Sequence, residues 1–106
     1  MGPDESKPFR VIYSEKHRSD LRLLIRWAGR LGQTEILIET LALINEGLEF
    51  DPAAFGDPIL RLPHMNATEY RVLRGPIRVT YAVHDYELVV FVKSISYFPE
   101  YGMRKR

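Results

Sequence analysis

The chain has 106 residues, a size that allows a single hydrophobic core and one domain. It contains no cysteine, which excludes disulfides and thiolate metal sites and fits a reducing cytoplasm, and no apolar run approaches the roughly 20 residues of a membrane-spanning helix. The net charge of +1 is unevenly distributed, because residues 1–58 carry seven basic and ten acidic side chains whereas residues 59–106 carry eight and four. A basic C-terminal half permits a nucleic-acid partner without demanding one.

The first half of the chain predicts one strand followed by two helices. Residues 1–7 are a polar lead that we expect to be disordered, and residues 8–13 alternate loosely, as a strand does. Ser14 is a suitable N-cap for a helix over residues 15–31, whose apolar arc covers about half of the helical wheel. Because a helix covered on one flank needs only a narrow stripe, we expect this helix to pack between the sheet and a second helix over residues 35–46.

The two predicted helices carry opposite charges. The first has arginines four residues apart, at Arg18, Arg22, Arg26 and Arg30, and the second carries Glu35, Glu39 and Glu46. Like charges at this spacing repel each other by a few tenths of a kcal/mol, so the arginine row gains from an acidic neighbour. We therefore predict an antiparallel helical hairpin with ion pairs between the helices. Contact of the arginine row with RNA or an acidic partner is the alternative.

The second half of the chain predicts strands. A loop over residues 49–58 leads to a short strand or strand-like segment at 59–62, and three further runs follow at 68–74, 77–83 and 87–95. The resulting order, β-α-α-β-β-β, predicts an α+β domain over residues 8–97 with a twisted, antiparallel-dominated sheet. The helical hairpin packs on one face, the first strand lies beside the last, and the uncovered face is the expected place for a site. Residues 98–106 form a basic tail.

The candidate functional side chains are arginines, a lysine and tyrosines. The three histidines lie in separate elements and lack metal-ligand spacing, and there is no glycine-rich phosphate loop or nucleophile elbow, so we expect neither metal nor cofactor. Basic residues stand in or beside the predicted strands at Arg71, Arg74, Arg78 and Lys93. They form either a solvated face or a phosphate cradle, because guanidinium groups bind phosphate oxygens in bidentate fashion.

The tyrosines divide in the same way. Tyr81 shares a strand face with Ile77 and Val79 and is interpreted as core. Tyr97 and Tyr101 lie in a more polar segment and are the freer candidates for stacking on bases.

Two segments resemble the RelE/ParE toxin superfamily of bacterial type II toxin–antitoxin systems, which includes plasmid stabilisation toxins. They read FRVIYSEKHRSDLRLLIRW and YRVLRGPIRVTYAVHDYELVVFVKSI. The hallmark of the family is a strand of pattern x-R-h-x-Y-x-h (h is apolar), a short acidic turn and a strongly apolar strand. These are IRVTYAV, HDYE and LVVFVKSI here. The resemblance covers residues 8–97 and implies the same β-α-α-β-β-β order.

The resemblance also implies a function. In the ribosome-dependent RNases of this family, basic residues on the middle strands bind mRNA, and a residue near the C-terminus helps the 2′-hydroxyl attack the neighbouring phosphate. Arg78 matches the arginine of the hallmark strand, and the resemblance assigns it a catalytic role together with Tyr97 and Tyr101. It assigns phosphate binding to Arg71, Arg74 and Lys93. The implied protein is a cytoplasmic, metal-independent endoribonuclease that cleaves mRNA on the ribosome and has a cognate antitoxin as partner.

Two alternatives stay open. Phe98 and Pro99 occupy positions where the RNases carry charge. The ParE branch, whose target is DNA gyrase, needs no catalytic set, so a non-catalytic gyrase inhibitor is the first alternative. A degenerate, non-toxic binding module is the second. A homodimer is a further hypothesis, and no membrane partner is expected.

Overall fold

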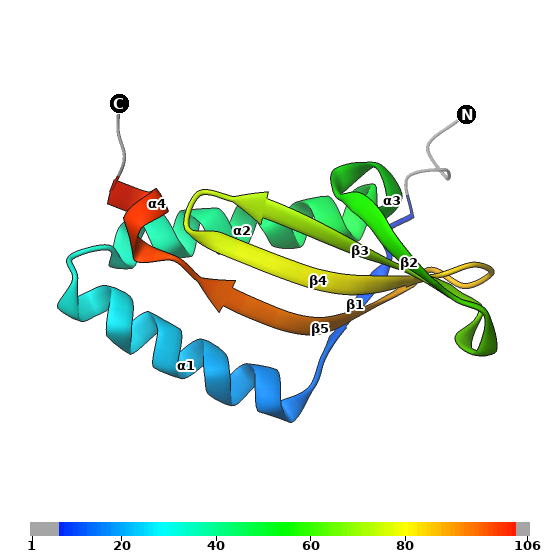
Figure 1. Ribbon diagram of the computed structural model, residues 1–106, viewed down its shortest axis with the longest axis horizontal. Coiled ribbons are helices and arrows are strands. Elements are labelled where there is room, and N and C mark those ends of the chain that lie inside the picture. The colour runs from blue at the N-terminus through cyan, green and yellow to red at the C-terminus, as the bar shows by residue number, and fades with distance from the viewer. Residues whose placement is uncertain (1–6, 104–106) are drawn as a thin grey trace.

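The computed structural model describes residues 7–103, which form one curved sheet with helices packed against it (Figure 1). The elements are β1 (Arg10–Tyr13), α1 (Glu15–Arg30), α2 (Thr34–Phe50), α3 (Pro52–Phe55), β2 (Asp57–Leu62), η2 (Pro63–Met65), β3 (Ala67–Arg74), β4 (Ile77–His84), β5 (Val89–Tyr97) and α4 (Pro99–Met103). The α+β fold and the order of its main elements are as predicted. Most of the lead expected to be disordered, and the last three residues, lie outside the described residues.

The sheet has five strands in the order β1-β5-β4-β3-β2. Strand β1 pairs with β5 in parallel, and the other neighbours are antiparallel. The prediction that the first strand lies beside the last is therefore confirmed. The segment at 59–62 is part of β2, an edge strand with an irregular register between Pro58 and Leu60. The tail differs from the prediction, because residues 99–103 form the short helix α4.

The core lies between the helices and β4, the central strand. Ile77, Val79 and Tyr81 alternate along β4 towards the helices and are buried. The Tyr81 hydroxyl donates a hydrogen bond of 2.7 Å to the carbonyl oxygen of Pro52, and its ring stacks on Tyr70. A buried phenol requires such a partner, because leaving it unpaired costs about 1–3 kcal/mol. This bond fixes the short helix α3 over the sheet.

A two-residue turn connects β3 to β4. Gly75 has φ of +52°, a conformation that glycine adopts without strain, and Pro76 follows it. A Cβ atom at Gly75 would also approach the Thr40 hydroxyl oxygen of α2 to 3.3 Å. The turn thus sets the register of β3 and β4 and rests on the start of the second helix.

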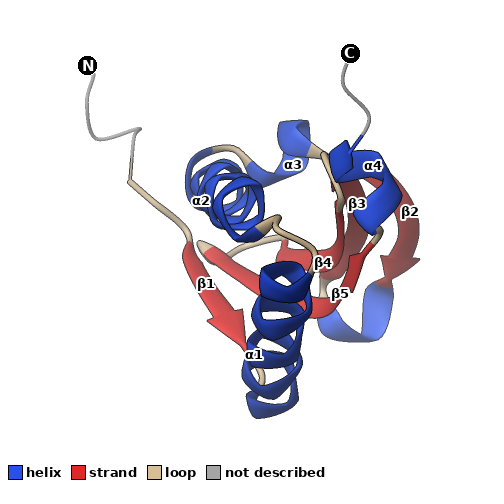
Figure 2. Cartoon of the chain, turned by 90° about the vertical axis from the view of Figure 1, so that its left-hand side faces the viewer, coloured by secondary structure: helices blue, strands red, loops and turns tan. Residues whose placement is uncertain are grey.

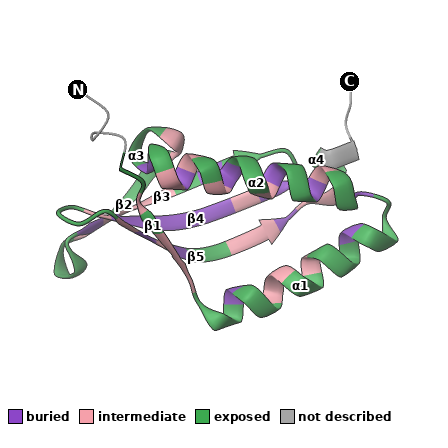
Figure 3. Ribbon diagram, turned by 180° about the vertical axis from the view of Figure 1, so that it is seen from behind, coloured by how far each residue is buried: buried purple, intermediate pink, exposed green. Residues whose placement is uncertain are grey.

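Helices α1 and α2 lie on the same side of the sheet but diverge from the loop that connects them (Figures 2 and 3). The expectation that α1 is packed between the sheet and α2 is wrong. Among the side chains of α1 only His17 and Ala28 are buried, whereas Leu23 and Trp27 are 58% and 41% exposed. The wide apolar arc of α1 is therefore not filled by core packing, because α2 leaves its outer part uncovered.

The predicted ion pairs between the helices are also absent. Within residues 7–103, no ion pair joins an arginine of α1 to a glutamate of α2. The pair that α1 does form is internal, between Lys16 and Asp20 at 3.1 Å. Because the helices diverge, all four arginines of the row are exposed, and none of them pairs with a glutamate of α2.

Leu37 and Leu43 on α2 provide a test of this packing. Leu37 is fully buried and Leu43 is 60% exposed. We expect Leu37→Ala to lower the free energy of unfolding by about 2–5 kcal/mol, because it leaves a cavity under the helix. Leu43→Ala should change it by less than about 0.5 kcal/mol. Urea unfolding followed by circular dichroism measures both, and equal losses would contradict the assigned orientation of α2.

Candidate nucleic-acid interface

The face of the sheet opposite the helices carries two of the predicted arginines. Strand register places Leu73 opposite Arg78 and Arg71 opposite Thr80, so Arg71 and Arg78 lie on this open face, two register positions apart. On the other side of β4, Ser96 pairs with Arg78. Arg71 is exposed and Arg78 is partly exposed, so both guanidinium groups are accessible to a ligand lying across the strands.

The C-terminal segment turns back to this arginine pair. The backbone N–H of Phe98 donates to the Pro76 carbonyl oxygen at 2.6 Å, which ties the segment to the β3–β4 turn. The guanidinium carbon of Arg78 then lies 5.2 Å from the centre of the Phe98 ring, in a cation–π contact. The Tyr101 ring is 5.8 Å from that of Phe98. Arg78 is therefore held against an aromatic pair, and we call Arg71, Arg78, Phe98 and Tyr101 the open-face site.

Lys93 lies on the same face but is already paired. It occupies an irregular position of β5, because Ser94 pairs with Thr80 and Val92 with Tyr81, which leaves Lys93 without a partner residue on β4. Its ammonium group binds Glu69 of β3 at 2.7 Å. Phosphate binding by Lys93 would require it to give up this contact. In contrast, neither Arg71 nor Arg78 has an ion-pair partner within residues 7–103.

Arg74 lies on the opposite side of the sheet from the open-face site. It follows Leu73 by one residue, so its side chain points towards the helices. Its guanidinium carbon is 4.6 Å from the centre of the Phe55 ring, and it donates to the Phe55 carbonyl oxygen at 3.3 Å. The sequence predicts Arg74, Arg71 and Arg78 as one group, but in the structure Arg74 lies on the other face of the sheet.

Tyr97 is also separated from the open-face site. It pairs with Ile77 at the end of β5, on the helix-covered face, and is 6% exposed. Its hydroxyl donates to the Gln33 side-chain oxygen at 2.6 Å, and its ring meets Trp27 edge-on. Burial raises the pKa of the Tyr97 phenol. Tyr97 is thus a core residue. The Tyr101 ring, in contrast, contacts the Phe98 ring, which in turn contacts Arg78.

Sequence reasoning missed the roles of Phe98 and Gln33. Phe98 was noted only as a departure from the charged family pattern, yet it is the ring on which Arg78 rests. The Gln33 side chain donates to the Pro99 carbonyl oxygen at 3.1 Å, so the loop between the helices holds the start of α4. The spacing of Phe98 after the last strand was the available signal for the first role. No local pattern indicates the second.

A second polar cluster lies at the far end of the sheet. Arg61 of β2 forms a two-pronged contact with Asp85 in the β4–β5 turn, with one bond of 2.8 Å, and its guanidinium group holds the pKa of Asp85 below the usual value. His84 accepts the backbone N–H groups of Tyr86 and Glu87 and shapes that turn. These side chains are occupied in structural contacts.

Among the described residues, no group of three or more His, Asp or Glu side chains could hold a metal ion. Within residues 7–103, no helix combines the length and apolar character needed to cross a bilayer.

The α+β fold of this chain is RelE-like. The solved structure that shows this is the toxin–antitoxin complex RelBE2 from Mycobacterium tuberculosis. One of its chains matches with a TM-score of 0.59 and 21% sequence identity, over 86% of this chain and 92% of that chain. No family model and no curated protein matches the sequence. The predicted fold resemblance is confirmed at the level of structure.

The buried tyrosines predict alkaline destabilisation. Burial raises the pKa of both Tyr81 and Tyr97 above the ordinary value of 10.0. The folded state therefore keeps these phenols protonated where the unfolded chain ionises them, so their stabilisation is complete below pH 10 and declines as the pH rises above it. We expect Tyr81→Phe to be less stable near neutral pH, through loss of the bond to Pro52, and to show a smaller decline above pH 10.

Urea unfolding at a series of pH values measures this effect. Tyr86→Phe is the control, because Tyr86 is 80% exposed, and it should keep the pH dependence of the parent. An identical alkaline decline in the parent and in Tyr81→Phe would contradict the burial argument.

Proposed function

We propose that this protein is the toxin of a type II toxin–antitoxin system and that it cleaves mRNA on the ribosome. The observation that carries the proposal is the pair of arginines, Arg71 and Arg78, on the open face of a RelE-like sheet, neither of which forms an ion pair within residues 7–103. Two guanidinium groups in successive pairs of the same sheet face suit adjacent phosphates of an RNA strand lying across β3 and β4. The aromatic rings of Phe98 and Tyr101 stand where a base can stack.

The proposed chemistry assigns separate tasks to these groups. The 2′-hydroxyl of one nucleotide loses its proton to water and attacks the adjacent phosphorus, and the bond to the 5′-oxygen of the next nucleotide breaks. The leaving 5′-oxygen takes up a proton from water, so the products are a 2′,3′-cyclic phosphate and a 5′-hydroxyl. Arg78 stabilises the negative charge that develops on the phosphate oxygens, and its contact with Phe98 fixes it beforehand. Arg71 binds a neighbouring phosphate. Tyr101 takes the position of the family tyrosine beside the attacking group, in place of the buried Tyr97.

Cleavage is tested with Arg78→Ala and the matched control Arg74→Ala. Both variants remove a strand guanidinium that makes a cation–π contact, but on opposite faces of the sheet. We expect Arg78→Ala to reduce cleavage of mRNA in a purified translation system by about 10²-fold, the usual loss when one stabilising donor is removed. Arg74→Ala should cleave at the parental rate. Equal activity of Arg78→Ala and the parent would show that Arg78 has no catalytic role.

The helix surface supports the proposal of an antitoxin partner. Leu23 and Trp27 on α1 and Leu43 on α2 are exposed, and arginines alternate with them along α1. Exposed apolar residues framed by one sign of charge suit an amphipathic segment of opposite charge. We therefore propose that an acidic antitoxin segment covers α1, because the neighbouring α2 is itself acidic, with Glu35, Glu39 and Glu46.

Growth of a bacterial host tests the toxin role. Expression of the chain alone should arrest growth, and co-expression of the protein encoded by the adjacent gene should restore it. Arg78→Ala should permit growth without that protein if cleavage causes the arrest. Unchanged growth on expression of the parent would instead favour a non-toxic binding module.

A gyrase inhibitor is the second candidate. The observation that favours it is the apolar character of the segment after β5, where Phe98 and Pro99 replace the charged residues of the RNases. In that case the purified protein inhibits supercoiling by DNA gyrase, and translation continues in its presence. Parallel assays of supercoiling and mRNA cleavage therefore separate the two targets.

A further inference from the structure

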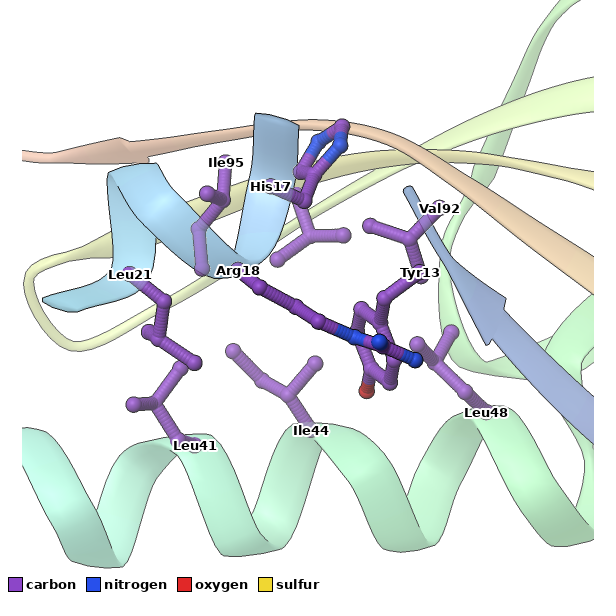
Figure 4. A pocket seen from close by; sticks show the side chains of 10 residues that line it. Tyr13, His17, Arg18, Leu21, Leu41, Ile44, Leu48, Val92 and Ile95 are labelled. Atoms are coloured by element: carbon purple, nitrogen blue, oxygen red, sulfur yellow. The ribbon is translucent and has the colours of Figure 1, made fainter. Parts of the chain in front are cut away.

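A cavity of about 130 Å³ lies between α1, α2 and the helix-covered face of the sheet (Figure 4). It occupies the wedge where the helices diverge, because its walls come from the first turns of α1 and the second half of α2. Leu21, Ile44 and Val92 represent its three walls, which are α1, α2 and the sheet. Its walls are mostly apolar, with Tyr13, His17 and Arg18 among the lining residues, and it lies on the opposite side of the sheet from the open-face site.

The size of the cavity indicates what fits inside it. A protein cavity of about 150 Å³ with aliphatic and aromatic walls stays dry and binds benzene. The present cavity is similar in volume and in lining, and it is open at one side between the two helices. A benzene-sized apolar body therefore fits, and a substituent on that body can project towards the opening.

Arg18 supplies the charge at the opening. In Figure 4 its side chain extends from α1 across the cavity. Within residues 7–103, the Arg18 guanidinium has no ion-pair partner. The other polar groups of the lining are engaged: the Tyr13 hydroxyl donates to Asn45 at 2.7 Å, and the His17 ring is 2.8 Å from the Ser14 hydroxyl. A bound molecule with an anionic group would therefore meet an available cation.

We propose that this cavity binds small amphipathic carboxylates, with an aryl or short alkyl body between the helices and the carboxylate paired with Arg18. Binding places the ligand in contact with α1, α2 and the sheet at once. The ligand therefore stabilises the folded chain and fixes the angle between the helices. This site is independent of the proposed RNA cleavage, because its residues share no side chain with the open-face site.

Three probes that share a phenyl ring and differ in charge test the proposal. Phenylacetate, 2-phenylethanol and 2-phenylethylamine carry an anionic, a neutral and a cationic group on the same phenyl ring. In calorimetric titrations of the full chain, we expect phenylacetate to bind most tightly and 2-phenylethylamine least. A series of longer straight-chain carboxylates should gain about fourfold in affinity for each added CH₂ until the cavity is full.

Two kinds of variant assign the binding to this cavity. Arg18→Gln keeps most of the side-chain stem and should bring phenylacetate to the affinity of 2-phenylethanol. Arg22→Gln, one turn further along α1 and outside the cavity, should leave all three affinities unchanged. Leu21→Trp fills the cavity and should abolish binding, and Leu41→Phe serves the same purpose if Leu21→Trp fails to fold by circular dichroism.

Three outcomes would overturn the proposal. They are no heat of binding with phenylacetate, equal affinities for the three probes, and binding that persists in a folded cavity-filling variant. If the cavity instead receives an apolar side chain of a protein partner, Leu21→Trp will lose that partner while phenylacetate gives no signal. Cleavage by the parent protein is measured separately, so failure of either proposal leaves the other intact.

Discussion

The division of β4 into two faces is the constraint on which the rest of the structure depends. The strand has a hydrogen-bonded neighbour on each side, so its register is fixed by β3 and β5 together. Ile77, Val79 and Tyr81 point to the helices and form the centre of the core, while Arg78 points away. A slip of one residue would bury Arg78 and expose Tyr81. The same pairing that stabilises the fold therefore presents the arginine to solvent.

The alternation of strand residues made part of the site predictable. It assigns Arg78 to the face opposite Ile77 and Val79, and strict application of it to β3 would have separated Arg71 from Arg74. Which of these two shares a face with Arg78 depends on the register between β3 and β4. The position of Tyr97 was harder to predict, because it depends on where β5 ends. The strand continues two residues beyond the predicted end at Ile95, and this extension turns Tyr97 into the core and leaves Phe98 to reach Arg78.

The arrangement of the helices could not be predicted from their own sequences. The apolar arc of α1 predicted its location on the sheet, but the angle to α2 depends on contacts between residues distant in the chain. Gln33 in the connecting loop binds both Tyr97 and Pro99, and this contact fixes one end of the hairpin. The other end is open because Leu21 and Ile44 line a cavity instead of meeting. The charge pattern predicted ion pairs between the helices, but it carried no information about how far apart the helices lie.

The parallel pairing of β1 with β5 has a consequence for the order in which the chain acquires its structure. Val11 lies beside Val90, and nearly the whole domain separates them along the chain. The closure of such a long loop is entropically unfavourable until the intervening elements have formed. During synthesis on the ribosome, β1 therefore cannot pair until β5 has been made, and Phe98 is added to the chain later still. The open-face site is completed among the last parts of the domain, so a partly synthesised chain cannot yet present it.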